Sequence, residues 1–244
     1  MGDSIPFAAP AFSRELETLK NSDDVLRKLT AEEKEAYSNA LVIADKLHGI
    51  RVASAKEIEK SVKETLEFLD MPKVVFFTSI KEECVEGKKE LYPDGADKIE
   101  FYISANAGAE PQPLSKIASG GELSRIMLAL KSVIADKDGI STVIFDEIDA
   151  GVSGKTARKI GIKMLNLAKK TQIICVTHSA QIASLADTHI LIRKKNVDEK
   201  TETEMIVLSD DGRINELSRI LGGINVTEAQ RRAAADMLNE RISY

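Results

Sequence analysis

The sequence predicts an α/β protein with a mainly parallel sheet and flanking helices, preceded by a long coiled-coil-like helix. Two short apolar strands, at 142–145 and 172–177, flank a helical stretch at 155–169. A strand–helix–strand unit joins parallel strands, so their carboxyl ends should share one edge of the sheet. The segment 13–70 has no proline, a single glycine and many charges, which predicts the long helix.

The long helix is expected to begin at Ala31, because Thr30-Ala-Glu-Glu33 fits a capping box, and to run to about Asp70. About 40 helical residues would span roughly 60 Å. Its apolar positions fit a heptad register, with a threonine filling one gap: Ala55, Ile58, Val62, Thr65 and Leu69. A coiled-coil strand and an amphipathic helix packed on the following domain both fit this pattern.

Further elements are expected on either side of the strand–helix–strand unit. Segments 73–80 and 98–105 predict strands of an antiparallel layer. Segments 188–193 and 204–209 predict a hairpin across a charged loop, in which the basic residues 193–195 are more typical of a solvated loop than of a DNA contact. Thr227-Glu-Ala-Gln230 is a second capping box, which predicts a final helix to about Ile242.

The first chemical signal is a pair of acids after the strand at 142–145. Asp146 and Glu147 follow its apolar run directly, at the edge where open α/β sheets bind their ligands. In P-loop ATPases an aspartate here holds Mg²⁺, which prefers hard oxygen ligands. The next glutamate can orient or deprotonate the attacking water. A strand that simply ends in solvated acids is the alternative.

Two further signals surround this strand. A helix is predicted at 122–135, and Ser119, Gly120 and Gly121 stand at its amino end, where unpaired N–H groups suit a phosphate. A serine N-cap after a loop is the alternative. His178 follows the strand at 172–177, where a neutral imidazole can donate to a γ-phosphate, although a lone histidine is more often structural.

These motifs together resemble a known family. Residues 119–122 look like the ABC signature motif, 143–147 like Walker B, 149–154 like the D-loop and 177–179 like the switch histidine. Their wording and order are similar to the heads of SMC-like ABC ATPases, most closely the RecN family of bacterial DNA repair proteins. The resemblance covers about 97–223.

The resemblance implies the fold of a P-loop NTPase, in particular the carboxyl-terminal lobe of an ABC-ATPase head, with ATP and Mg²⁺ as cofactors. Asp146 would hold the metal, and Glu147 and His178 would be catalytic for the nucleotide on their own head. The nucleotide on the opposite head would be contacted by residues of the signature motif and D-loop: Ser119, Gly120, Gly121, Glu122 and Asp149.

The same resemblance implies three partners. One is the amino-terminal half of the head with the Walker A loop, which is missing from these 244 residues. The others are a second head, in an ATP-sandwiched homodimer, and DNA. ATP binding and hydrolysis would drive head dimerisation on DNA in double-strand break repair and recombination. The isolated chain is therefore expected to be inactive.

Two other function classes remain open. The chain could be a non-enzymatic interaction fragment. It could also be a small P-loop kinase using Lys155, because 151–156 ends in Gly-Lys-Thr; however, a Walker A loop needs glycine five residues before Gly154, and Asp149 stands there. ATP binding to the isolated chain distinguishes these classes.

Composition sets the outer limits. A net charge of −5 with 30% charged residues excludes a bulk polycation, so any DNA contact must be local. Two distant cysteines and the lack of a signal peptide or apolar span favour a reduced cytoplasmic protein that is not associated with a membrane. The family resemblance implies that it is associated with the nucleoid. The expected organisation is a tag or disordered segment at 1–12, a helical coiled-coil stub at 13–71 and the half-head at 72–244.

Overall fold

The computed structural model describes residues 9–104, 108, 110–116, 120–197, 200–223 and 225–241. The chain divides into two compact units, Met1–Ser54 with Ser79–Ile99, and Ala55–Thr78 with Glu100–Tyr244. Within the described ranges, no helix combines the length and apolar character needed to cross a membrane.

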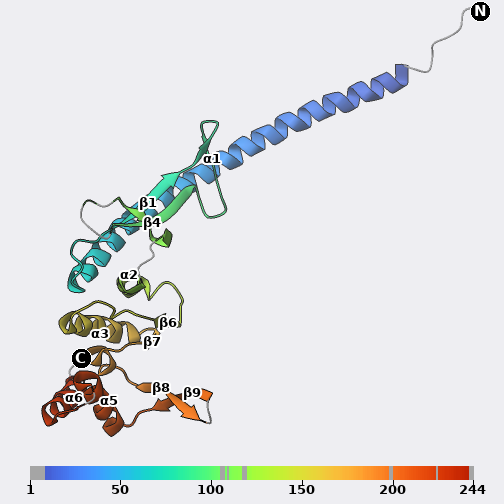
Figure 1. Ribbon diagram of the computed structural model, residues 1–244. Helices are drawn as coiled ribbons and strands as arrows, with labels where there is room; N and C mark the ends of the chain where they lie inside the picture. The colour runs from blue at the N-terminus through green and yellow to red at the C-terminus, as the bar shows by residue number, and fades with distance from the viewer. Residues whose placement is uncertain are drawn as a thin grey trace, which may run out of the picture. The chain divides into compact units, whose positions relative to one another are not determined.

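Helix α1 spans Ala9–Phe68, so it begins well before the predicted start at Ala31 (Figure 1). The capping-box prediction was wrong, because Thr30 lies inside the helix and its hydroxyl donates to the carbonyl of Leu26 at 2.8 Å. An interior threonine commonly satisfies its hydroxyl in this way. Of the segment 1–12, residues 1–8 lie outside the described residues and 9–12 are helical.

The smaller unit combines the first part of α1 with a short antiparallel hairpin, β2 (Cys84–Val85) and β3 (Lys88–Lys89). Asp97, whose side chain is almost completely buried, joins α1 to the strand that follows this hairpin by accepting from Arg51 Nη1 at 3.0 Å. Its other oxygen lies 2.6 Å from His48 Nδ1. These polar contacts fix this stretch of the helix.

A second small sheet has the strand order β1 (Val75–Glu82), β4 (Asp97–Ser104) and β5 (Gln112–Pro113). Strands β4 and β5 are antiparallel, and the 3₁₀ turn η1 (Leu114–Lys116) follows. The two predicted strands of this layer are confirmed, each shifted by at most two residues.

The expected strand–helix–strand unit is confirmed. Strand β6 spans Thr142–Phe145, helix α3 spans Gly154–Ala168 and strand β7 spans Gln172–Cys175. The strands are parallel and in register from Thr142 opposite Gln172 to Phe145 opposite Cys175. Helix α2 (Gly120–Ile134) precedes β6, close to its predicted bounds.

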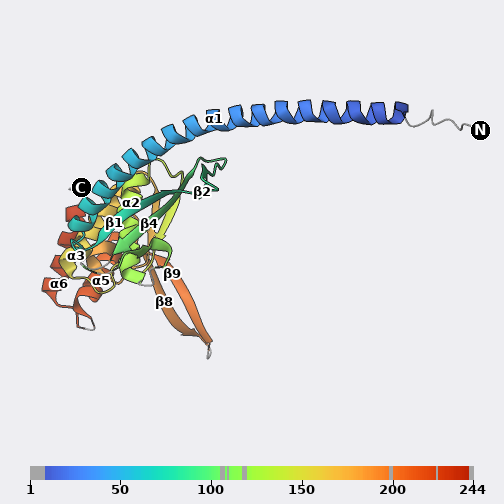
Figure 2. The ribbon, with the colours of Figure 1, turned by 90° about the horizontal axis from the view of Figure 1, so that it is seen from above.

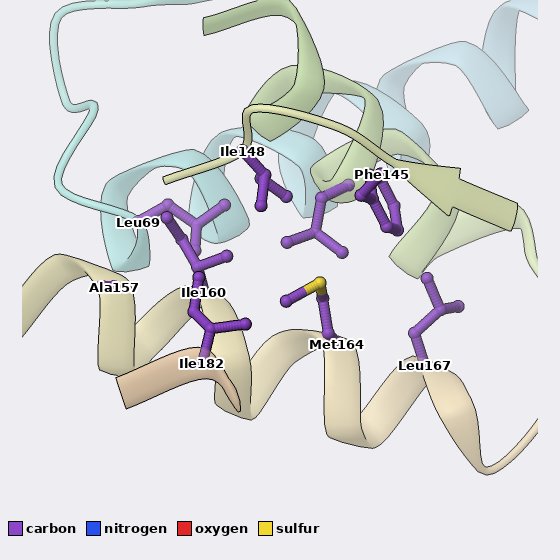
Figure 3. Close-up of a cluster of buried hydrophobic side chains, with 9 residues drawn as sticks. Leu69, Phe145, Ile148, Ala157, Ile160, Met164, Leu167 and Ile182 are labelled. Atoms are coloured by element: carbon purple, nitrogen blue, oxygen red, sulfur yellow. The ribbon is translucent and has the colours of Figure 1, made fainter. Parts of the chain in front are cut away.

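The buried face of this unit packs on α2, on a short helix that follows β7 and on the end of α1 (Figure 3). α3 supplies one apolar stripe at helical spacing, β6 supplies Phe145, and the short helix α4 (Ala180–Ala183) supplies Ile182. Leu69, just after α1, is completely buried in the same cluster. The further members shown are Ile148, Ala157, Ile160, Met164 and Leu167. This core fixes the carboxyl end of β6.

The carboxyl-terminal part differs from expectation in two ways. Strands β8 (Ile190–Val197) and β9 (Lys200–Val207) continue through the predicted charged loop and form a hairpin that projects away from the helices (Figure 2). The charged residues fit a ladder because opposite charges face each other, as in the Arg193–Glu204 pair at 2.7 Å. Lys194 and Lys195, which were expected in the charged loop, lie in β8, and Arg193 before them is ion-paired with Glu204.

A helix that was not predicted, α5 (Asp210–Gly222), follows the hairpin. Its signals were present, since Ser209 caps it and Asp210 and Asp211 lie in its first turn. Helix α6 (Glu228–Glu240) has the predicted capping box at Thr227, and α5 and α6 pack together. The second capping-box prediction is therefore confirmed.

Candidate functional site

The acidic pair lies at the carboxyl end of β6, as predicted. Asp146 and Glu147 are both exposed. Among the described residues, neither side chain makes a hydrogen bond or an ion pair, so four carboxylate oxygens are available to a ligand. Adjacent unneutralised carboxylates suit a hard divalent cation, and the site therefore fits Mg²⁺.

Glu147 has an unusual backbone. Its φ of +54° lies in the left-handed region, which costs a residue with a Cβ on the order of 1–3 kcal/mol. The turn is closed by a hydrogen bond from Ala150 N to the Glu147 carbonyl at 3.0 Å. Strain of this kind is concentrated at functional sites, and no sequence pattern predicts it at Glu147.

The two glycines of α2 pack directly on this turn. A Cβ on Gly120 would lie 2.9 Å from Glu147 Oε2, and one on Gly121 would lie 3.0 Å from the Glu147 carbonyl oxygen. A larger residue at Gly121 would displace the backbone of the acidic turn, whereas one at Gly120 would push the Glu147 carboxylate aside. Their predicted contact with a phosphate stays a prediction. Ser119 lies outside the described residues.

Two neighbours in α2, which sequence reasoning passed over, anchor the same turn. Ser124 Oγ donates to the Asp146 carbonyl at 3.0 Å. Arg125 is buried, and its Nη1 donates to the carbonyls of Ile148 at 3.3 Å and Ala150 at 3.2 Å. Burial lowers the pKa of Arg125, and the charge of Glu122 partly opposes this shift. The available signal was an arginine on the apolar side of a helix.

We expect Arg125→Met to lower the free energy of unfolding by about 1–3 kcal/mol, because the carbonyls of Ile148 and Ala150 lose their donor while the apolar stem is kept. Urea denaturation of the chain measures the change. Arg232→Met is the matched control, since the Arg232 side chain is 79% exposed and its ion pair with Glu228 is 4.0 Å long; it should change stability by less than about 0.5 kcal/mol. Equal losses in both variants would contradict the anchoring role.

Asp149 connects the two strand ends. Its side chain is 2% exposed, and Oδ2 accepts from Thr177 Oγ1 at 2.5 Å and from His178 N at 3.1 Å. Thr177 Oγ1 in turn accepts from Ser179 N at 3.0 Å. Within this chain Asp149 therefore holds the turn that carries His178, whereas its predicted contact with a nucleotide stays a prediction.

His178 is held by its backbone, and most of its ring is exposed. Its Nδ1 lies 3.3 Å from Asp149 Oδ2, and the side chain is 83% exposed. The parallel register places Phe145 opposite Cys175, so the acids and the histidine follow neighbouring strand ends. The topology therefore places Asp146, Glu147 and His178 at one edge of the sheet, as the sequence predicts.

Cys175 is the last residue of β7, directly before this edge. Burial, and then the negative charges of Asp149 and Asp146, raise the pKa of its thiol to about 12. The thiol is consequently protonated at neutral pH and cannot act as a nucleophile or a metal ligand there.

The Gly-Lys-Thr sequence forms no phosphate-binding loop. Gly154 begins α3 directly after its N-cap, Ser153. The Thr156 hydroxyl is already engaged, 2.8 Å from Asp70 Oδ2 and 3.1 Å from Ser153 Oγ. The geometry gives no support to a kinase that uses Lys155.

The chain is similar in sequence to known proteins. The chain is 37% identical to the DNA repair protein RecN of Halalkalibacterium halodurans over 237 residues, which cover 97% of this chain and 42% of that protein. It is 36% identical to the DNA repair protein RecN of Vibrio cholerae over 228 residues, covering 93% of this chain and 40% of that protein.

The chain belongs to the RecN family. It spans about two-fifths of the length of these RecN relatives. No protein-family model matches it. A solved structure, the Smc head domain from Pyrococcus furiosus with an extended coiled coil and the C-terminal domain of ScpA bound, covers 86% of this chain at 20% identity with a TM-score of 0.51. This likeness confirms the predicted head fold for a RecN-family chain.

Proposed function

We propose that this chain is the carboxyl-terminal lobe of an ATPase head, and that it supplies the catalytic edge for ATP hydrolysis. One observation carries the proposal: the free carboxylates of Asp146 and Glu147 stand beside a histidine turn held by buried Asp149. The left-handed backbone of Glu147 supports this proposal, because backbone strain of this kind is frequent at functional sites.

Each residue of the edge has a distinct role in this proposal. Asp146 holds Mg²⁺, which neutralises phosphate charge when bound. Glu147 accepts the proton of the attacking water. His178, with an exposed ring, donates to the terminal phosphate. Asp149 keeps the His178 turn in place through its two hydrogen bonds.

The partner lobe carrying Walker A would cover one exposed apolar face. Ile144 and Ile174 are opposite each other in the β6–β7 pair and are 66% and 46% exposed, and Val176 beyond β7 is 54% exposed. Strands of parallel sheets are ordinarily covered on both faces. Burying one such side chain stabilises by roughly 1.5–3 kcal/mol, so this face favours a lobe that completes the sheet.

A second head would meet the amino end of α2. In this arrangement Ser119, Gly120 and Gly121, with Glu122 and Asp149 nearby, close over the nucleotide of the opposite head. The amino end of α2 suits a phosphate because its N–H groups are unpaired and carry the positive end of the helix dipole. ATP would then bridge two heads in a homodimer.

This arrangement is tested by Ser119→Arg in a full-length RecN-family protein with these residues. The variant should bind ATP with nearly parental affinity on each head but fail to dimerise, because the side chain fills the space of the opposing phosphate. Equilibrium binding and light scattering with ATP separate the two effects. Loss of monomer binding with dimerisation retained would reject the assignment to the opposite head.

The relatives are named as DNA repair proteins, so we propose that head dimerisation acts on DNA in double-strand break repair and recombination. A net charge of −5 requires any DNA contact to be local. Such a protein would work in the cytoplasm, at the nucleoid. A non-enzymatic interaction fragment is the second candidate, favoured only by the exposed apolar face of β6 and β7.

A further inference from the structure

The residue that closes the carboxyl end of α1, Asp70, is unusual in that position. Asp70 has a φ of +60°, and backbone hydrogen bonds from Asp70 N to Glu67 O and from Met71 N to Leu66 O close the helix around it. Glycine is the residue that ordinarily occupies this conformation at helix ends. Backbone closure alone therefore does not explain an aspartate.

The carboxylate of Asp70 contacts the beginning of α3. Its Oδ1 accepts from Lys159 Nζ at 2.5 Å, and its Oδ2 accepts from Thr156 Oγ1 at 2.8 Å. These hydrogen bonds, that of Lys159 foremost, hold the pKa of Asp70 below its ordinary value. The group is therefore an anion at neutral pH.

The rest of the last turn of α1 follows the same face of α3. Lys159 Nζ lies 5.5 Å and Lys163 Nζ 5.9 Å from the centre of the Phe68 ring, and Lys163 Nζ lies 3.4 Å from Thr65 Oγ1. Positions 156, 159 and 163 share one helix face. The helix end thus docks on α3 through a continuous set of contacts.

Thr156 leads from Asp70 to the loop at 149–153. Its hydroxyl lies 3.1 Å from Ser153 Oγ, which also accepts from Thr156 N at 3.3 Å as the N-cap of α3. An open cleft of about 560 Å³ lies between these elements; its lining includes Leu69, Asp70, Gly151, Val152, Ser153 and Thr156. One end of the loop is therefore tied to Asp70, and the other end contains Asp149.

We propose that Asp70 is a positioning residue for the ATPase reaction, which fixes the loop at 149–153 to the carboxyl end of α1 through Thr156. This inference rests on the proposed function. A displacement of the end of α1 moves the anchor of the loop whose Asp149 holds the His178 turn. The carboxyl end of α1 and the catalytic edge are thereby mechanically coupled.

The first test uses the isolated chain and does not depend on ATPase activity. Asp70→Gly removes the carboxylate but accepts the positive φ, so it separates side chain from backbone closure. Hydrogen exchange of amides 150–157 should accelerate about tenfold or more, while exchange in α6 stays unchanged. Asp136→Gly is the matched control, because Asp136 accepts from Lys170 Nζ at the same 2.5 Å, at the other end of α3. Unchanged exchange at 150–157 in Asp70→Gly would overturn the positioning role.

The second test uses a full-length RecN-family protein. Asp70→Gly should lower kcat about 10- to 100-fold with the KM for ATP within about twofold, since misplacement of catalytic groups lowers the rate without removing binding contacts. Asp70→Asn should recover part of kcat, because asparagine tolerates positive φ and keeps an acceptor for Thr156. Parental kcat in Asp70→Gly would overturn the assignment of Asp70 alone, whereas a wild-type protein without turnover would overturn the proposed function as well.

Discussion

A full-length protein carrying Glu147→Gln is expected to bind Mg-ATP and keep its heads together while turnover falls about 10²–10⁴-fold, the typical loss for a general base. The amide keeps the shape of the side chain and can hydrogen-bond the water, but it cannot accept a proton at neutral pH. The backbone at 147 should be unaffected, since both residues have the same branching at Cβ. A phosphate-release assay beside light scattering with ATP measures both effects.

Asp146→Asn is the control for this experiment. It removes one charge from the proposed metal site and should weaken Mg²⁺-dependent ATP binding itself, so dimerisation and turnover should fall together. The comparison separates a role in proton transfer from a role in metal binding. Parental turnover in Glu147→Gln would remove Glu147 as the base.

The isolated chain is expected to hydrolyse ATP no faster than the buffer background. Positioning of the phosphates supplies most of the catalysis of phosphoryl transfer, and the sequence contains no Walker A loop to cradle them. A separately produced Walker A lobe, added in excess, should restore turnover by covering the exposed face around Ile144 and Ile174. Phosphate release at increasing lobe concentration provides the measurement.

Two variants show whether the restored turnover depends on Lys155 or on the apolar face at Ile144. Lys155→Ala should leave the restored turnover unchanged, because Lys155 is an exposed residue at the start of α3. Ile144→Asp should prevent restoration by placing a charge on the apolar face. Steady turnover by the chain alone that Lys155→Ala abolishes would favour the kinase interpretation instead.

Local patterns predicted the parts of the fold that are locally determined. The bounds of β6 matched the structure, because a short β-branched run between polar residues leaves little choice. The predicted start of α1 was wrong, because the sequence pattern of a capping box can also occur inside a helix, as it does at Thr30. Helix α5 was missed because Gly212 in its first turn and the Gly222-Gly223 pair at its carboxyl end resemble loop composition.

The candidate site was predicted at the level of residues but not of contacts. Topology alone places Asp146, Glu147 and His178 at one edge. The hydrogen bonds of Asp149, the anchoring by Arg125 and the conformation of Glu147 all depend on residues 20 or more positions apart in the chain or on backbone angles. No periodicity in a single sequence reports such relationships.

The raised pKa of Cys175 has a consequence for oxidative chemistry. Peroxides attack the thiolate form of cysteine, and a thiol with a pKa of about 12 supplies almost none of it at neutral pH. Part of that shift comes from Asp146 and Asp149, so acids placed at the strand end for other reasons also suppress sulfenic acid formation beside them. Cys84 is exposed, so it is the thiol that should record oxidative damage first.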